Sequence, residues 1–392
     1  MAKVMLMSLG SRGDMEPFLA KAEELLEKGH EVALCMPAQF QGLASEVSAT
    51  WFGMDPAFLD LIESPEVQKI TGQIGSPLSR IRTILRLMRS TKGIQQQLIR
   101  DQKRAVDAFQ PDRIVFHIKC IYPAMLGATH QCDVELLSPI PCMIHPITEE
   151  PHIGFGKPCG ARWNRLTYRL ANRIMIRKNI LDFGGDLARE WGMSLDHQTL
   201  SSFFLTQLPI EVATESALFS RPAAWPSHVR MTGFRERDKA RHWTPDPALE
   251  DFLEANPRPI YVGFGSMING RPSEVGQAIV DAAQAVGVPV VLNASWGGIE
   301  LKGVPPHAFL VDDVPFDWLF ARVRAVVHHG GSGTTHSALR FGLPQLIVPH
   351  IADQHFWARC IQRQGMGPQG FPIKDLDRGK LESAFKALLD MA

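Results

Sequence analysis

The chain has 392 residues, of which 45% are hydrophobic and 8% aromatic, so it is long enough for two domains with complete hydrophobic cores. Its 41 basic residues balance its 41 acidic residues, which gives no reason to expect a nucleic acid or a strongly acidic partner. The 6 cysteines form neither a C-x-x-C pair nor a metal-ligand spacing with histidine, which favours reduced thiols and a cytoplasmic location.

The chain opens with a predicted βαβ unit. It consists of a strand over Val4–Leu9, a glycine turn at 10–14, a helix over about Pro17–Lys28 and a strand over Glu31–Met36. Asp14 is thereby predicted on the loop beyond the carboxyl end of the first strand, the edge at which open α/β sheets bind their ligands. A helix cap is the competing interpretation of the same aspartate.

Two later stretches, 77–104 and 161–178, are predicted as helices that combine an apolar stripe with arginines. No acid occurs between Glu66 and Asp101, and none occurs within 161–178. Such helices bind anionic bilayers, with about 1 kcal/mol for each cation near the surface, although a solvated basic face over a packed core gives the same pattern. No apolar run is long enough to span a membrane. Both helices belong to the first half of the chain. The bilayer interpretation therefore predicts that this half makes a peripheral contact with the inner face of an anionic membrane.

The rest of the first half predicts three further strands, over Asp112–Phe116, over Ser138–Ile144 with proline edges, and over Pro209–Thr214. Residues 145–160 are rich in proline, glycine and histidine, which predicts a long loop over a ligand cleft. Residues 221–258 combine prolines with charges, so we place the interdomain linker there.

The second half restarts with a strand over 260–262 and a glycine turn. A helix over Ser273–Val286, a strand over Pro289–Ala294 and an extended segment over Ala308–Asp312 continue the alternation. We therefore predict the α/β class, with two Rossmann-like doubly wound domains facing across a cleft. The predicted boundaries are an acceptor-binding domain at 1–220, the linker at 221–258, and a nucleotide-sugar donor domain at 259–392.

The stretch 325–348 predicts a strand, a glycine-rich turn, a helix and a second strand. The turn contains three glycines and two side-chain donors: Gly330, Gly331, Gly333, His329 and Thr334. The glycines allow a sharp bend and a close approach to a ligand, while the N–H groups of residues 332–335 are predicted to be free at the helix start. Free amides at the positive end of a helix bind anions, so we predict a phosphate or diphosphate here. A tight turn without a ligand is the competing interpretation.

Five ordered motifs resemble those of B-type nucleotide-sugar glycosyltransferases: Gly10-Ser11-Arg12-Gly13-Asp14, Gly263-Phe264-Gly265-Ser266-Met267, Val314-Pro315-Phe316-Asp317-Trp318-Leu319-Phe320, the turn 328–335, and Asp353-Gln354. The resemblance is to the UDP-glycosyltransferase family, nearest the branch of sterol glucosyltransferases and glycopeptide-antibiotic glycosyltransferases, and it runs from residue 3 to about 375. Three shorter stretches also resemble the sterol branch: Pro146, Pro151-His152 and Asn164-Arg165-Leu166-Thr167-Tyr168.

In that family the glycine turn binds the donor diphosphate, the stretch around Val314 flanks the nucleotide base, and an Asp-Gln pair holds the sugar hydroxyls. The resemblance therefore implies the following donor contacts: Ser11, Ser266, Val314, His329, Gly331, Ser332, Gly333, Thr334, Asp353 and Gln354. It implies Asp14 as the acidic base, with His117 and His152 as the next candidates. Two features depart from the family pattern. Phe316 stands where many relatives carry histidine, and valines at 311 and 314 replace the tryptophan and glutamine that plant relatives use against uracil.

The resemblance implies an inverting, metal-independent transfer of a hexose to a hydroxyl of a sterol, terpenoid, carotenoid or other hydrophobic alcohol. UDP-glucose is the first choice of donor, and a thymidine-linked sugar is the second. We expect no cofactor beyond the nucleotide-sugar co-substrate, no metal and no nucleic-acid partner; the acidic triplet Asp375-Leu376-Asp377 is predicted to be surface. Three other functions stay open: an antibiotic-type transferase acting on a soluble polyketide or peptide, a nucleotide-sugar epimerase, and a non-catalytic nucleotide-sugar-binding protein.

Overall fold

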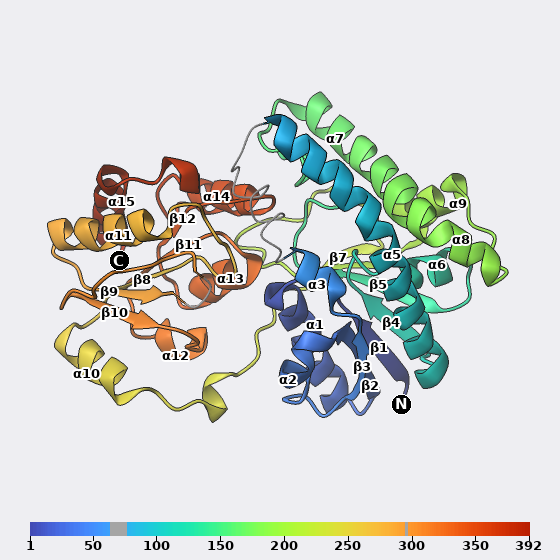
Figure 1. The fold of residues 1–392 in the computed structure, drawn as a ribbon, viewed down its shortest axis with the longest axis horizontal. Helices are drawn as coiled ribbons and strands as arrows, with labels where there is room; N and C mark the ends of the chain where they lie inside the picture. Colours follow the sequence, from blue (N-terminus) through green and yellow to red (C-terminus); the bar gives the residue numbers. More distant parts are fainter. Residues whose placement is uncertain (63–76, 295–296) are drawn as a thin grey trace. The chain divides into compact units, whose positions relative to one another are not determined.

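The computed structural model describes residues 1–62, 77–294 and 297–392, with the side chains of 62, 77–90 and 242 outside the description (Figure 1). The chain divides into two compact units. Unit 1 contains residues 1–216 and 220–237, and unit 2 contains residues 217–219 and 238–392. The passage from Arg237 to Asp238 lies inside the segment 221–258, which also contains a strand of unit 1 and a helix of unit 2.

Unit 1 is built on a seven-stranded parallel sheet. Its strands, in spatial order, are β3 (Thr50–Met54), β2 (Glu31–Pro37), β1 (Lys3–Met7), β4 (Arg113–Phe116), β5 (Asp133–Ser138), β6 (Ile210–Val212) and β7 (Val229–Met231). The order reverses direction at β1, since β2 lies on one side of it and β4 on the other. This reversal defines a doubly wound sheet, as the sequence predicted.

The helices of unit 1 pack on both faces of this sheet. They are α1 (Arg12–Glu27), α2 (Gln41–Ala44), α3 (Ala57–Ile62), α5 (Pro77–Phe109), α6 (Ile121–Ala128), α7 (Ala161–Ile174), α8 (Asp182–Glu190) and α9 (His197–Ser202). A 3₁₀ turn, η1 (Ala38–Phe40), and two π-helical segments, η2 (Met175–Leu181) and η3 (Phe203–Gln207), complete the unit. Helix α1 packs its apolar side on alternate residues of β1, β2 and β4, where Leu6, Leu34 and Val115 are buried with Phe18. Helices α5 and α6 contact the strands as well, and right-handed crossovers put them on the other face.

Unit 2 is a smaller doubly wound sheet of five parallel strands (Figure 1). Its strands, in spatial order, are β10 (Ala308–Val311), β9 (Val290–Asn293), β8 (Ile260–Gly263), β11 (Ala325–His328) and β12 (Gln345–Ile347). Its helices are α10 (Pro247–Ala255), α11 (Pro272–Val286), α12 (Phe316–Leu319), α13 (Ser332–Arg340), α14 (Gln354–Arg363) and α15 (Arg378–Met391). Two short turns, η4 (Ala240–His242) and η5 (Ile373–Asp375), complete the unit. One face packs against α11 and α15, and the other packs against α10, α12 and α13. The predicted α/β class is therefore confirmed in both units.

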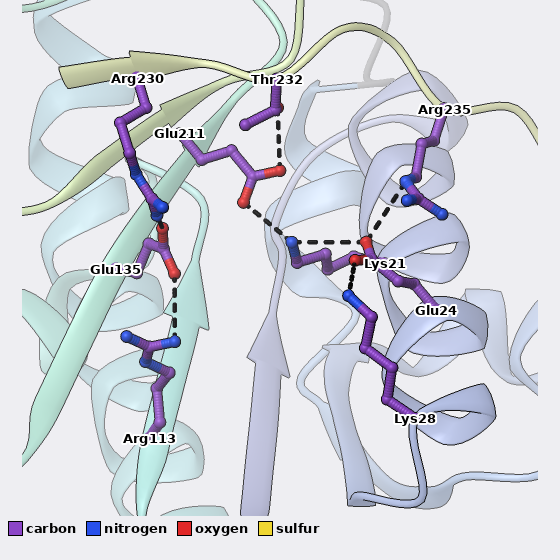
Figure 2. Close-up of polar contacts among 9 residues, drawn as sticks. All are labelled: Lys21, Glu24, Lys28, Arg113, Glu135, Glu211, Arg230, Thr232 and Arg235. Atoms are coloured by element: carbon purple, nitrogen blue, oxygen red, sulfur yellow. Dashed lines mark hydrogen bonds and ion pairs between the residues drawn. The ribbon is translucent and has the colours of Figure 1, made fainter.

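One strand prediction is wrong. The strand expected at Ser138–Ile144 ends at Ser138, and the ladder is formed instead by Asp133–Ser138. Prolines at 139 and 141 have no N–H to donate to a ladder, so the chain leaves the sheet there. The sequence did not reveal this strand because it contains Glu135, a buried carboxylate that arginines on β4 and β7 neutralise. Figure 2 shows this carboxylate between Arg113 and Arg230, and nearby Glu211 accepts from Lys21 and Thr232.

The helix predicted at 77–104 is present as α5, which continues to Phe109. The predicted basic and apolar sides at 77–89 lie outside the described side chains, so they stay a prediction. No helix in the described ranges combines the length and the hydropathy that a membrane span requires.

Candidate active site

In unit 1 the point at which the strand order reverses carries a cluster of polar side chains. Strands β1 and β4 are parallel neighbours, with Met7 opposite Phe116, so the segments that follow them leave the same edge of the sheet. Asp14 follows β1, and His117 and Lys119 follow β4. Ligands of doubly wound sheets bind at such a switch point.

Helix α1 begins at Arg12, five residues before the predicted start, so Asp14 is in its first turn and not on the loop before it. One carboxylate oxygen of Asp14, Oδ2, accepts from the Ser11 N–H at 2.7 Å and from the Ser11 hydroxyl at 3.1 Å. Asp14 is therefore the N3 residue of a capping box whose N-cap is Ser11, so it takes part in the start of α1. Both the N–H and the hydroxyl of Ser11 therefore donate to Asp14.

The second carboxylate oxygen of Asp14, Oδ1, faces two basic groups. Lys119 Nζ donates to it at 2.9 Å, and His117 Nε2 lies 3.5 Å away. A Cβ atom on Gly10 would lie 2.2 Å from Oδ2 and 2.6 Å from Lys119 Nζ, and Gly10 has a φ of 138°. Only glycine therefore fits beneath this ion pair.

The protonation state of this cluster follows from its contacts. Burial alone would raise the pKa of Asp14, but Lys119, His117 and the hydrogen bonds from Lys119 and Ser11 outweigh burial and hold that pKa below its usual value. Burial and the Lys119 charge lower the pKa of His117 to about 4. His117 is therefore neutral at pH 7, and Lys119 is the cation that keeps Asp14 ionised.

In unit 2 the strand order reverses between β8 and β11, and both strands end in glycine turns. His328, the last residue of β11, lies opposite Gly263, the last residue of β8, so the two turns leave the sheet side by side. The turn after β11 leads into α13, whose N-cap is Gly331. Among the described residues, the N–H groups of Gly333 and Thr334 have no acceptor.

One amide of this turn differs from the prediction. The N–H of Thr335 donates to the Gly331 carbonyl at 3.0 Å and so forms the first bond of α13. The amides predicted to bind an anion are therefore to be sought among the residues before Thr335. The helix start still presents donors and the positive end of its dipole to a ligand.

The His329 ring is held between the two glycine turns. A Cβ on Gly331 would lie 2.5 Å from its Nε2, and a Cβ on Gly265 would lie 2.9 Å from its Cε1. Burial, followed by the effects of His328 and His350, lowers the pKa of His329 well below its ordinary value, so the ring is neutral at pH 7. Its Nδ1 has no hydrogen-bond partner within the described ranges. A neutral imidazole can donate one hydrogen bond to an anion at the turn.

The other predicted donor contacts follow neighbouring strands at the same edge. Ser266 is exposed after β8, and Asp353 and Gln354 follow β12. A Cβ on Gly330 would lie 3.2 Å from Gln354 Cα, so the glycine turn is packed against the start of α14. Ala352, which directly precedes the Asp353-Gln354 pair, has a φ of 48°, a strained value for a residue with a side chain.

Gln354 has a structural role that the sequence did not reveal. Its Oε1 accepts from the N–H of His350 at 2.7 Å and from the N–H of Ile351 at 2.9 Å, and the residue is 4% exposed. The side-chain oxygen is therefore committed to the backbone, and only the amide NH₂ remains for a sugar hydroxyl.

We predict that Gln354→Ala lowers the free energy of unfolding of unit 2 by about 2–4 kcal/mol, because two backbone donors lose their acceptor. Thermal unfolding of the chain, analysed for the transition of unit 2, measures this loss of stability. Gln354→Glu keeps the acceptor oxygens and removes the NH₂, so it should retain most stability. Equal destabilisation by both substitutions would contradict this role.

Val314 and Phe316 follow β10 at the far side of the same sheet edge, and both pack on the core of unit 2. Phe316, where relatives carry histidine, stacks on Phe320 with ring centroids 4.5 Å apart. Its ring therefore serves packing. Asp375 and Asp377 of the triplet predicted at the surface are exposed, whereas Leu376 between them is buried in the core of unit 2. Asp377 caps α15 by accepting from the Lys380 N–H. No group of three metal-ligating side chains with suitable geometry occurs in the described part of the chain.

Lys119 is the residue that sequence reasoning missed. It belongs to no motif, and its contact with Asp14 spans 105 positions. The available signal was topological, since a lysine just after the strand next to β1 must lie at the same sheet edge.

Two family models match separate parts of the chain. Residues 4–111 match the glycosyltransferase family 28 N-terminal domain, and residues 277–392 match the erythromycin biosynthesis protein CIII-like C-terminal domain. A sterol 3-beta-glucosyltransferase of Arabidopsis thaliana is 31% identical over 406 residues, which cover 99% of this chain and 61% of the relative. A sterol 3-beta-glucosyltransferase of Pichia angusta is 26% identical over 97% of this chain and 30% of its own length.

Solved structures give the same fold. A kitacinnamycin glycotransferase has a TM-score of 0.68 at 16% identity, covering 99% of this chain and 90% of that one. A calicheamicin glycosyltransferase has a TM-score of 0.67 at 17% identity, covering 99% and 89%. The chain spans about three-fifths of the plant relative, 61%, and under a third of the yeast relative, 30%. Both units therefore match glycosyltransferase domain families, and the fold is that of the B-type glycosyltransferases.

Proposed function

We propose that this chain transfers a hexose, with UDP-glucose as the donor, to the hydroxyl of a sterol or similar hydrophobic alcohol, with inversion and without a metal ion. The observation that carries the proposal is the glycine turn after β11, where amide donors and the His329 ring meet at the switch point of unit 2. The curated relatives named above supply the acceptor class.

The donor half of the proposal rests on unit 2. A nucleoside diphosphate carries negative charge that grows on the leaving phosphate as the glycosidic bond breaks. Helix α13 begins at Ser332 with its amides toward this charge, and His329 adds a side-chain donor. Each such contact contributes about 0.3–2 kcal/mol to the stabilisation of the leaving group. Ser266, Asp353 and the NH₂ of Gln354 are the further donor contacts in this proposal.

The acceptor half rests on unit 1. Asp14 Oδ1 would take the proton of the attacking hydroxyl, because Oδ2 already accepts two hydrogen bonds from Ser11. Lys119 occupies the same Oδ1 atom and lowers its basicity. The hydroxyl must therefore share Oδ1 with Lys119 or displace it, so Lys119 sets the pH range in which the base works.

We predict that Lys119→Met moves the acid limb of the kcat/KM profile to higher pH. Asp14 is active only when deprotonated, and its lowered pKa keeps it deprotonated into the acid range. Loss of the ammonium raises that pKa, so activity should disappear at a higher pH as the medium is acidified. Lys103→Met, which removes a half-buried lysine paired with Asp107, is the matched control and should leave the profile unchanged. Coincident profiles for parent and Lys119→Met would exclude this influence.

The acceptor class is the finer part of the proposal. Sterols reside in membranes, so we also propose that the chain meets its acceptor at an anionic membrane surface. Turnover with UDP-glucose is to be compared between a detergent-dispersed sterol and a panel of soluble polyketide and peptide aglycones, with TDP-glucose as the competing donor. Preference for the sterol and for UDP-glucose supports the proposal, and preference for a soluble aglycone contradicts its acceptor half. Proton NMR of the product reports inversion through the coupling at the anomeric position.

A further inference from the structure

Helix α7 has the reverse of the burial that a helix of a globular protein normally shows. Its inward side is polar: Asn164, Thr167, Tyr168 and Asn172 are at most 8% exposed. Its outward side carries four large apolar side chains at spacings of three or four residues: Trp163, Leu166, Leu170 and Ile174, which are 43%, 49%, 44% and 48% exposed. An apolar stripe normally faces the core, so this one is available to a partner.

The polar side fixes α7 firmly to unit 1. Asn164 Nδ2 donates to the Thr148 carbonyl at 2.9 Å, and Asn172 Nδ2 donates to the Ile144 carbonyl at 3.0 Å. Thr167 Oγ1 accepts from the His152 N–H at 2.9 Å. Specific hydrogen bonds therefore hold the helix in place and determine that its apolar stripe points outward.

A row of cations runs beside the apolar stripe. The five arginines of this stretch are all exposed, and none forms an ion pair with a described acid: Arg162, Arg165, Arg169, Arg173 and Arg177. The chain contains no acidic residue between 161 and 181. In Figure 1 this helix and η2 form the long green run that continues into α8, which α5 contacts. The outer face of α7 thus combines strong positive charge with exposed apolar area.

We propose that this outer face of α7 docks on an anionic lipid bilayer. The apolar stripe would enter the boundary between headgroups and acyl chains, while the arginines reach lipid phosphates with their long side chains. Trp163 suits this depth because tryptophan prefers the membrane interface. A second copy of the chain fits the face poorly, since two arginine rows of the same sign would oppose each other. The inference rests on the membrane contact proposed above and assigns that contact to α7, from the burial and charge of this helix.

Vesicle co-sedimentation of the full chain tests this. We expect the parent to pellet with phosphatidylcholine vesicles containing phosphatidylserine and to stay in the supernatant with phosphatidylcholine alone, and binding should weaken at least about tenfold between low and high salt. Arg165, Arg169 and Arg173 changed together to Glu should weaken binding by about hundredfold or more, since about 1 kcal/mol per cation is lost and repulsion is added. Leu166, Leu170 and Ile174 changed together to Ser should also weaken binding while leaving the charge intact.

The matched control changes three exposed lysines of unit 2, Lys302, Lys374 and Lys386, to Glu, which alters the net charge equally. This variant should bind vesicles like the parent. The thermal midpoint and the circular dichroism of each variant report whether it is folded and keep the docking result separate from the proposed activity. A parent that stays in the supernatant at low salt, or α7 variants that bind as well as the parent, would overturn the proposal. So would a dimer that the α7 variants dissociate.

Discussion

Replacing Asp14 by asparagine is expected to lower kcat by about 10²- to 10⁴-fold, because the proposed general base loses its proton acceptor. The fold should survive, since asparagine keeps the size of the side chain and an oxygen for the Ser11 N–H. UDP affinity should also survive, because the proposed donor site belongs to unit 2. Steady-state kinetics, UDP calorimetry and the thermal midpoint of the same preparation separate these effects.

The control for this substitution is Asp377→Asn, which changes another aspartate that caps a helix. Asp377 accepts from the Lys380 N–H at 2.9 Å at the start of α15 and is exposed. It should lose neither activity nor stability beyond the small difference between the two caps. Full turnover by Asp14→Asn would transfer the base role to another group, with His117 and His152 as the next to be tested.

Replacing His329 by alanine is expected to weaken UDP binding by about 10- to 100-fold, which corresponds to one lost hydrogen bond to a charged group. Its ring fills the space between Gly265 and Gly331, so the substitution also loosens both turns. Calorimetry with UDP measures the loss, and addition of a metal chelator should leave the parent affinity unchanged.

His307→Ala provides the comparison for His329. Its ring hydrogen-bonds the Val280 carbonyl on α11 and plays no part in the proposed donor site. This variant should bind UDP as the parent does. If His329→Ala also binds UDP at the parent level, the diphosphate site must lie elsewhere in the chain.

Local sequence signals were sufficient wherever the backbone itself forms the site. Gly330 and Gly265 have φ values of 93° and 55°, so glycine at these positions marks the sharp turns after β11 and β8 directly. Because strands and helices alternate along the chain, the strands of the sheet are parallel. The turns that follow them therefore lie at the same edge of the sheet. The donor turn was therefore predictable without knowledge of any side-chain contact.

Long-range contacts were not predictable in this way. Lys119 and Gln354 act through partners fixed by the tertiary fold, and Glu135 occupies a strand that looked too polar because its neutralising arginines are on other strands. The predicted start of α1 is five residues late because proline is favoured at the first helical position, which places the start at Pro17. The cap formed by Ser11 and Asp14 instead starts the helix earlier.

Helix α7 shows that a sequence pattern does not reveal which side of a helix is buried. An apolar stripe beside an arginine row has the same periodicity whether the stripe is buried or exposed. Only the burial of Asn164, Tyr168 and Asn172 reveals that the helix turns its polar side inward. The sequence therefore predicted the surface chemistry of α7, and the structure determined which side is outside.

The most direct measurement of the central claim is a product analysis with UDP-glucose labelled in the sugar and a dispersed sterol. We expect free UDP and a labelled sterol glucoside to form in equal amounts, and we expect Asp14→Asn to form neither at an appreciable rate. Labelled UDP-sugar epimerised without release of UDP would identify an isomerase. Tight binding of the donor without any turnover, on the sterol or on the soluble aglycones, would identify a binding protein and contradict the proposed transfer.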